Sequence, residues 1–211
     1  MPERRLDDVV ARRRDAALAG HMGDADRARS FLDDQDPDVR ATALGALNRL
    51  GVLASHELLD AIVDPHPIMR RRACTESTTW GGAVGDPIDP EIASAIARLL
   101  EDEDDSVVEI AAWACGERPP ATPATIDRLC AIATEHDDAL CRESAVAALG
   151  ALGDRAGLPA ILAATEDRAT VRRRAIIALA PFDGPEVDAA IERATQDRDW
   201  QVRQAAEDLS P

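Results

Sequence analysis

Few residues of this chain combine the types and spacing that chemistry requires. His56 and Glu57 form the single His-Glu pair, which could supply one imidazole and one carboxylate to a metal ion. One pair cannot complete such a site, and the same two residues suit the start of a capped helix. The sequence contains no nucleophile with a plausible base and no glycine-rich phosphate loop. We therefore expect no catalysis, no metal and no cofactor.

The four cysteines lie far apart and show neither CxxC spacing nor the histidine pattern of a zinc site. Three of them fall at apolar positions of the repeat described below. Since free cysteine is usually buried and inert, we interpret them as small buried hydrophobic residues, with a reactive thiol as the alternative. They are Cys74, Cys115, Cys130 and Cys141.

Three arginine triplets, at 12–14, 70–72 and 172–174, could bind phosphate groups, because the guanidinium fork matches phosphate oxygens. All 24 basic residues are arginines, but 40 acidic residues give the chain a formal net charge of -16. This negative field opposes binding to a polyanion, and no aromatic residues are interleaved with the triplets. We expect no nucleic-acid partner.

The chain of 211 residues is 45% hydrophobic but only 2% aromatic, so its apolar content is mostly Ala, Leu, Val and Ile. This mixture favours closely packed short helices. No window approaches the ~20 apolar residues of a membrane span, and no apolar signal-peptide core follows the charged N-terminal stretch. We expect a single cytoplasmic domain, residues 1–211, without a membrane partner.

A sequence repeat predicts the fold. Residues 36–51 contain Asp-Pro-Asp-Val-Arg and end with Leu-Gly, and later segments repeat the Val-Arg pair and the apolar residues that follow it. Each copy has apolar residues at i, i+4, i+8 and i+11, the stripe of an amphipathic helix, and a shorter helical stretch precedes it. The pattern predicts an all-α fold of about six helix pairs behind an N-terminal helix near 3–19. The second helices are expected near 37–51, 67–80, 104–117, 138–153, 168–180 and 199–209, with a loop or hinge over 81–90.

These segments resemble HEAT repeats, in particular the short bacterial repeats named after phycobilisome lyase subunits. The resemblance implies a right-handed α-α superhelix in which a turn aspartate and an early arginine form a ladder between successive repeats. Val108 replaces the arginine in the third repeat, so the ladder is expected to be interrupted there. The ladder arginines implied by the resemblance are Arg40, Arg70, Arg142, Arg172 and Arg203.

Related HEAT-repeat enzymes have features that this sequence lacks. Deoxyhypusine hydroxylase holds two irons with several His-Glu pairs, and HEAT-like DNA glycosylases keep a basic groove. The resemblance to bilin lyases implies an alternative function, an accessory subunit that acts on a chromophore or a client protein. Fold analogy alone supports it.

Second helices line the concave face of such solenoids, and this face is the usual binding surface. Positions two and six residues after Val39 point away from the apolar stripe, so their equivalents should lie on that face. The first column reads Ala41, Arg71, Glu109, Glu143, Arg173, Gln204, and the second reads Gly45, Thr75, Trp113, Ala147, Ile177, Asp208.

From these columns we predict a candidate partner-binding set of Arg71, Glu109, Trp113, Glu143 and Arg173, flanked by Arg72 and Arg174. Two alternatives stay open: the charges could merely solvate the helices, and Trp113 could fold into the core. Trp80 and Trp200 are interpreted as structural. The function predicted is a monomeric, non-catalytic scaffold that binds a protein or peptide.

Overall fold

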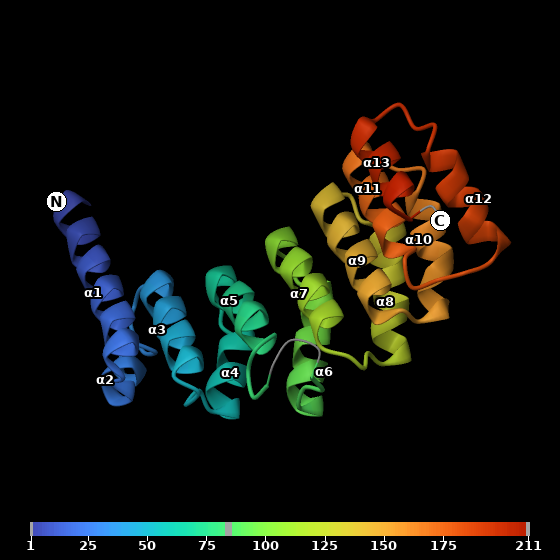
Figure 1. The fold of residues 1–211 in the computed structure, drawn as a ribbon. Coiled ribbons are helices and arrows are strands. Elements are labelled where there is room, and N and C mark those ends of the chain that lie inside the picture. Colours follow the sequence, from blue (N-terminus) through green and yellow to red (C-terminus); the bar gives the residue numbers. More distant parts are fainter. Residues whose placement is uncertain (1, 83–85, 210–211) are drawn as a thin grey trace. The chain divides into compact units, whose positions relative to one another are not determined.

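The computed structural model describes residues 2–82 and 86–209, and every regular element in these ranges is a helix (Figure 1). The chain forms two compact units, Met1–Ile96 and Ala97–Pro211, and each is described by itself. The expectation of one continuous domain stays a prediction. The predicted loop over 81–90 separates α5 from α6, and its residues 83–85 lie outside the described ranges.

In unit 1, α1, α3 and α5 pack side by side, α2 packs on α1 and α3, and α4 packs on α5 (Figure 1). Helix α6 begins in unit 1 and ends in unit 2. The helices are α1 (Pro2–Met22), α2 (Ala25–Ser30), α3 (Pro37–Arg49), α4 (Ser55–Ile62), α5 (Pro67–Ser77) and α6 (Pro90–Arg98).

In unit 2, the second helices α7, α9, α11 and α13 pack in succession, and the first helices α8, α10 and α12 pack against them. The elements are η1 (Leu99–Glu101), α7 (Asp105–Glu117), α8 (Pro123–Glu135), α9 (Ala139–Leu152), η2 (Arg155–Gly157), α10 (Leu158–Ala164), α11 (Ala169–Ala178), α12 (Pro185–Ala194) and α13 (Trp200–Leu209). The predicted all-α HEAT-type fold is confirmed.

The helices begin and end at residues that satisfy their terminal backbone groups. Asp36 caps α3 by accepting a hydrogen bond from the Asp38 amide at 3.0 Å, with Pro37 at the first helical position. Asp104 and Asp138 cap α7 and α9 in the same way. Gly153, with a φ of 64°, ends α9 in the left-handed region that glycine adopts most readily.

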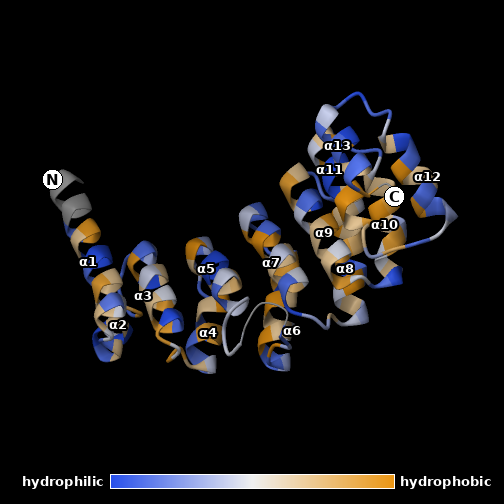
Figure 2. Ribbon diagram, viewed as in Figure 1, coloured by the Kyte–Doolittle hydropathy of each residue, from blue (hydrophilic) through white to orange (hydrophobic). Residues whose placement is uncertain are grey.

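The residue equivalent to Val39 is buried in every second helix, and we number each of these helices from it as position 0. Positions +4 and +5 follow it on the same helix face, and in α3 both are fully buried. Figure 2 shows this mixture of apolar and polar residues on each helix. The residues at position 0 are Val39, Met69, Val107, Cys141, Val171 and Val202.

Neighbouring second helices approach closely through small residues. A Cβ added to Gly116 of α7 would lie 2.7 Å from the Cα of Ala148 in α9. A Cβ added to Gly150 of α9 would lie 2.7 Å from the Cα of Ala178 in α11. Position +9 of one helix therefore faces position +7 of the next, and this sets the register of α7, α9 and α11.

Contacts of the predicted ladder are seen in the described ranges at the α3–α5, α9–α11 and α11–α13 junctions. Arg40 donates two hydrogen bonds to Asp64, at 2.9 and 3.1 Å. Arg142 binds both carboxylate oxygens of Asp167, at 2.6 and 2.9 Å, and Arg172 binds those of Asp197, both at 2.8 Å. Arg142 and Arg172 also donate to backbone carbonyls of the turn before their own helix, so each joins two repeats.

Arg70 and Arg203 likewise donate to carbonyls of the turns before their own helices. The ladder is interrupted at the α7–α9 junction on both sides. Val108 occupies the arginine position, and His136 occupies the position of the turn aspartate, where its Nδ1 accepts from the Asp138 amide at 3.1 Å.

Helix α1 takes the place of a second helix, which the repeat did not predict. Arg12 donates to both carboxylate oxygens of Asp34, at 2.8 and 3.2 Å, as a ladder arginine does. A Cβ added to Gly20 would lie 2.7 Å from the Cβ of Ala46, the same approach as between the second helices of unit 2. None of the described helices is both long and apolar enough to cross a membrane.

Candidate partner-binding site

Helix α7 presents one face that carries three carboxylates and an aromatic ring. Asp105, Glu109, Trp113 and Glu117 follow at intervals of four residues, so they share this face. Asp105 is exposed, and the other three are half-buried. Trp113 is thus neither a core residue nor fully exposed, and part of it is available for contact from outside.

The side-chain carboxylates of Glu109 and Glu117 have no hydrogen-bond or ion-pair partner among residues 2–82 and 86–209. Oδ1 of Asp105 lies 3.8 Å from Nε2 of His136. The face of α7 therefore keeps its negative charge largely uncompensated by arginine.

The neighbouring helices α9 and α11 differ in this respect. Glu143 Oε1 accepts a hydrogen bond from Nη2 of Arg174 at 3.4 Å, which joins the two helices. The Nε of Arg174 is buried and makes no hydrogen bond within the described part of the chain. Arg173 is exposed and has no such partner there. Of the predicted charges in unit 2, Glu143 is engaged, whereas Glu109 and Arg173 are free.

An apolar row crosses the three helices at position +6, where α7, α9 and α11 carry Trp113, Ala147 and Ile177. Ile177 is 38% exposed, so part of its side chain is accessible from outside. Ala147 is half-buried and short, so the row is lower at α9 than on either side. Together with the charges of position +2, these residues form the second-helix face of unit 2.

The candidate set divides between the two units. Arg71 lies on α5 in unit 1 and is exposed, whereas the other four residues lie in unit 2. Two column members in unit 1 were wrongly predicted to be open. Ala41 is 8% exposed, and Gly45 is covered by the guanidinium of Arg72, which a Cβ added to Gly45 would meet.

Of the two tryptophans interpreted as structural, one differs from that interpretation. Trp80 is half-buried and donates from Nε1 to the carbonyl of Leu53 at 2.8 Å, which is a structural role. Trp200 is 65% exposed at the start of α13, so it does not belong to the core. Its place two residues before the buried Val202 puts it on a different helix face from the core stripe.

The thiol of Cys141 lies close to the negatively charged residues of α7, and its pKa is affected by them. Its Sγ donates to the backbone carbonyl of Asp105 at 3.2 Å. Burial, followed by the negative charges of Asp138, Asp105 and Glu109, raises the pKa of this thiol to about 12. Burial also raises the pKa of Cys115 to about 12. Both thiols therefore stay protonated and unreactive at neutral pH.

Most arginines of the three triplets form hydrogen bonds or ion pairs with other residues of the chain. Arg12 and Arg172 pair with ladder aspartates, Arg72 forms an ion pair with Glu76 at 2.7 Å, and Arg174 binds Glu143. In each triplet the arginines are therefore dispersed over different neighbours instead of facing one ligand.

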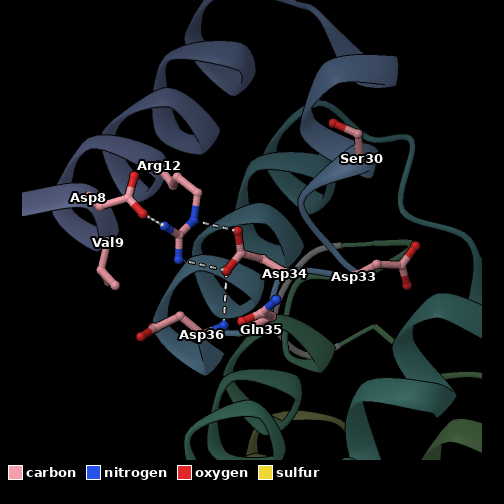
Figure 3. Close-up of a pocket in the computed structure, with 8 residues that line it drawn as sticks. All are labelled: Asp8, Val9, Arg12, Ser30, Asp33, Asp34, Gln35 and Asp36. Atoms are coloured by element: carbon pink, nitrogen blue, oxygen red, sulfur yellow. Dashed lines mark hydrogen bonds and ion pairs between the residues drawn. The ribbon is translucent and has the colours of Figure 1, made fainter. Parts of the chain in front are cut away.

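A pocket of about 720 Å³ lies at the start of unit 1, between α1 and the turn that precedes α3. Figure 3 shows the residues that line it. Its walls include the Arg12–Asp34 rung and the ion pair between Arg12 and Asp8, at 2.6 Å. The lining residues are Asp8, Val9, Arg12, Ser30, Asp33, Asp34, Gln35 and Asp36. The pocket thus surrounds the first ladder rung, and the candidate residues lie elsewhere. Within the described ranges, no three His, Cys, Asp or Glu residues are placed to hold a metal ion.

The HEAT-repeat family model matches residues 55–150 and 126–209, more than half of the chain. The chain therefore belongs to the HEAT-repeat family, as the ladder and the paired helices already indicate. No curated protein sequence matches it.

Two solved structures show how similar the fold is to known proteins. A chain of the complex of CpcE and CpcF of phycocyanin lyase from Nostoc sp. PCC7120 aligns with a TM-score of 0.63 and 22% identity, over 86% of this chain and 74% of that one. A designed armadillo repeat protein in complex with the peptide (KR)4 aligns with a TM-score of 0.59 and 14% identity, over 87% of this chain and 96% of that one. At these identities the similarity concerns the fold alone.

Two residues of the second-helix face were absent from the predicted columns. Asp105 and Glu117 extend the α7 face, and their spacing of four residues from Glu109 and Trp113 was a usable signal. Ile177 stood in the second column of the open face but was not included in the candidate set.

Proposed function

We propose that the protein is a non-catalytic interaction module that binds a protein or peptide on the second-helix face of unit 2. The main observation behind this proposal is the apolar row at position +6, in which Trp113 is half-buried and Ile177 is 38% exposed. Large aromatic and aliphatic side chains that remain accessible beside charged groups are typical of interface anchors.

The fold supports this proposal, because stacked helix pairs provide an extended surface, and such a surface suits a protein or a peptide better than a small ligand. The designed armadillo protein with a similar fold was solved with a peptide bound. Glu109 and Arg173 offer opposite charges on the same face, which can orient a bound segment.

A photo-crosslinking amino acid at position 177 tests the proposal in cells that produce the protein. We expect a covalent adduct with a specific protein or peptide, and its loss when Trp113→Ala is added, because Trp113 supplies the largest contact area. The same amino acid at Ala163, an exposed residue of the first helix α10, is the matched control. Equal adducts at both positions, or an adduct that is indifferent to Trp113→Ala, would place the interface elsewhere.

A second candidate function is an accessory subunit that acts on a chromophore or a client protein. The similarity to the phycocyanin lyase chain, with a TM-score of 0.63, is the observation that favours it. An absorbance titration with a linear tetrapyrrole should show a spectral change if the protein holds a chromophore. An unchanged spectrum at saturating protein concentration would remove this candidate.

A further inference from the structure

We propose that the occupant of the second-helix face is a peptide segment that carries a basic side chain next to an apolar one. This inference rests on the proposed function, and it adds the chemistry of the partner. The apolar side chain would lie on Trp113 and Ala147, and the basic side chain would lie beside Glu109.

Several carboxylates of unit 2 are already paired with arginines of the fold. Asp167 and Asp197 are held by ladder arginines, and Glu143 is held by Arg174. Because these carboxylates are already paired with arginines, a cation of a partner would gain little binding free energy by contacting them. On α7, the side-chain carboxylates of Glu109 and Glu117 have no partner in the described part of the chain, so they are available to a cation from outside.

Trp113 lies between the two unpaired carboxylates of α7, so the aromatic ring and the negative charges form one surface. Trp113 lies four residues after Glu109 and four before Glu117, so a carboxylate stands one helical turn away on each side of the ring. A lysine or arginine of the partner can pair with a carboxylate while its alkyl stem covers the ring. Unit 2 as a whole contains 23 Asp and Glu against 12 Arg, so its field also favours approach of a basic segment.

Arg173 limits where the basic side chain can lie. It is exposed on α11, four residues before Ile177, and it would repel a cation placed over that helix. The partner's positive charge is therefore directed toward α7, and a neutral or acidic residue is favoured toward α11. The charges thus set an orientation as well as a composition.

Selection from a library of short random peptides displayed on phage tests the composition without assuming it. Peptides are selected on the wild-type chain and counter-selected on Trp113→Ala, so that only peptides dependent on this face are kept. We expect enrichment of arginine or lysine next to a large apolar residue. For an enriched peptide, Glu109→Gln should weaken binding by about two- to fivefold, and Arg173→Gln should strengthen it or leave it unchanged. Glu192→Gln, an exposed carboxylate on α12, is the control that should have no effect.

The outcomes separate the inference from the proposed function. Peptides that depend on Trp113 but are acidic or neutral, or that ignore Glu109→Gln, would overturn the basic partner and keep the binding face. An empty selection, in which the counter-selection on Trp113→Ala removes every peptide that binds wild type, would overturn both. Circular dichroism and a thermal melt of each variant establish that it is folded before binding is compared.

Discussion

The α9–α11 and α7–α9 junctions of unit 2 share one packing device and differ in their charges. Both use a glycine at position +9 against an alanine at position +7. At α9–α11, Arg142 binds Asp167 and Arg174 binds Glu143. At α7–α9, Val108 and His136 replace the ladder pair, and the carboxylates of the α7 face have no arginine.

The difference shows how a repeat protein divides its charges between fold and surface. Where the ladder is present, carboxylates hold successive repeats in register and are hidden from a partner. Where the ladder is absent, apolar and small-residue packing holds the junction, and carboxylates remain on the face. The α7–α9 junction is therefore both the place where the ladder is interrupted and the centre of the proposed site.

Acid should have the largest effect, because it weakens the Arg142–Asp167 and Arg172–Asp197 rungs at once. The hydrogen bonds from Arg142 and Arg172 hold the pKa values of Asp167 and Asp197 below the ordinary aspartate value of 3.8. The stability they contribute is fully present above that value and is lost as pH falls through the lowered native pKa values. Urea unfolding from about pH 6 to about pH 2.5 should show this loss. The Asp167→Asn, Asp197→Asn double variant should lose less stability over the same range, and an identical loss in both proteins would contradict this account.

Breaking one rung should have the next largest effect. Arg142→Ala leaves the Asp167 carboxylate, which is 19% exposed, without its cation, and it also frees the carbonyls of His136 and Asp137. We expect a loss of about 2–3 kcal/mol in the free energy of unfolding, measured by urea denaturation. Arg173→Ala, the exposed neighbour of a ladder arginine on α11, is the matched control and should change stability by less than about 0.5 kcal/mol. A small effect of Arg142→Ala would mean that the ladder does not hold the repeats.

Substitution of the closely packed glycines should have the third largest effect on stability. The loss should depend on whether the new Cβ meets backbone atoms or a flexible side chain. In Gly150→Ala the new Cβ meets the backbone of Ala178, which cannot move away easily, so we expect a loss of about 1–2 kcal/mol. In Gly45→Ala the new Cβ meets the flexible end of Arg72, which can turn away, so the loss should be smaller. Thermal melts of the two variants compare them directly, and equal losses would contradict the distinction.

Restoring the missing rung should have the smallest effect. Val108→Arg alone places a charge at a position that is 2% exposed and should destabilise the protein. Adding His136→Asp supplies the carboxylate that other turns provide, so the double variant should recover part of that loss, with a coupling of about 1 kcal/mol. A double-mutant cycle by urea denaturation measures the coupling. A coupling of zero would show that this junction differs from the others in backbone geometry as well as in sequence.

The fold could be predicted because the same residues recur with the same spacing. Asp36 and Pro37 mark a helix start, and Val39 and Arg40 mark the buried face and the ladder of that helix. The role of α1 could not be predicted, because its helix lacks this pattern. Arg12 pairs like a ladder arginine, but Ala11 and Asp15 stand where other second helices have buried apolar residues.

The site was less predictable, because exposure depends on neighbours that the repeat does not specify. Ala41 and Gly45 were assigned to the open face, but α3 lies between α1 and α5 and receives long side chains from both sides. Arg13 donates to Thr42 at 3.3 Å, and the Arg72 guanidinium lies on Gly45. The columns also did not predict the pairing of Glu143 with Arg174, because Arg174 lies one residue after Arg173, the column member on α11.

The most direct test of the central claim is the affinity of two synthetic peptides, one alternating Arg with Leu and one alternating Glu with Leu, measured by fluorescence polarisation. The account predicts that the Arg peptide binds wild type at least about tenfold tighter, and that Glu109→Gln with Glu117→Gln removes most of this preference. Equal affinities for the two peptides, or a preference that survives the double substitution, would contradict the claim that the unpaired carboxylates of α7 serve a basic partner.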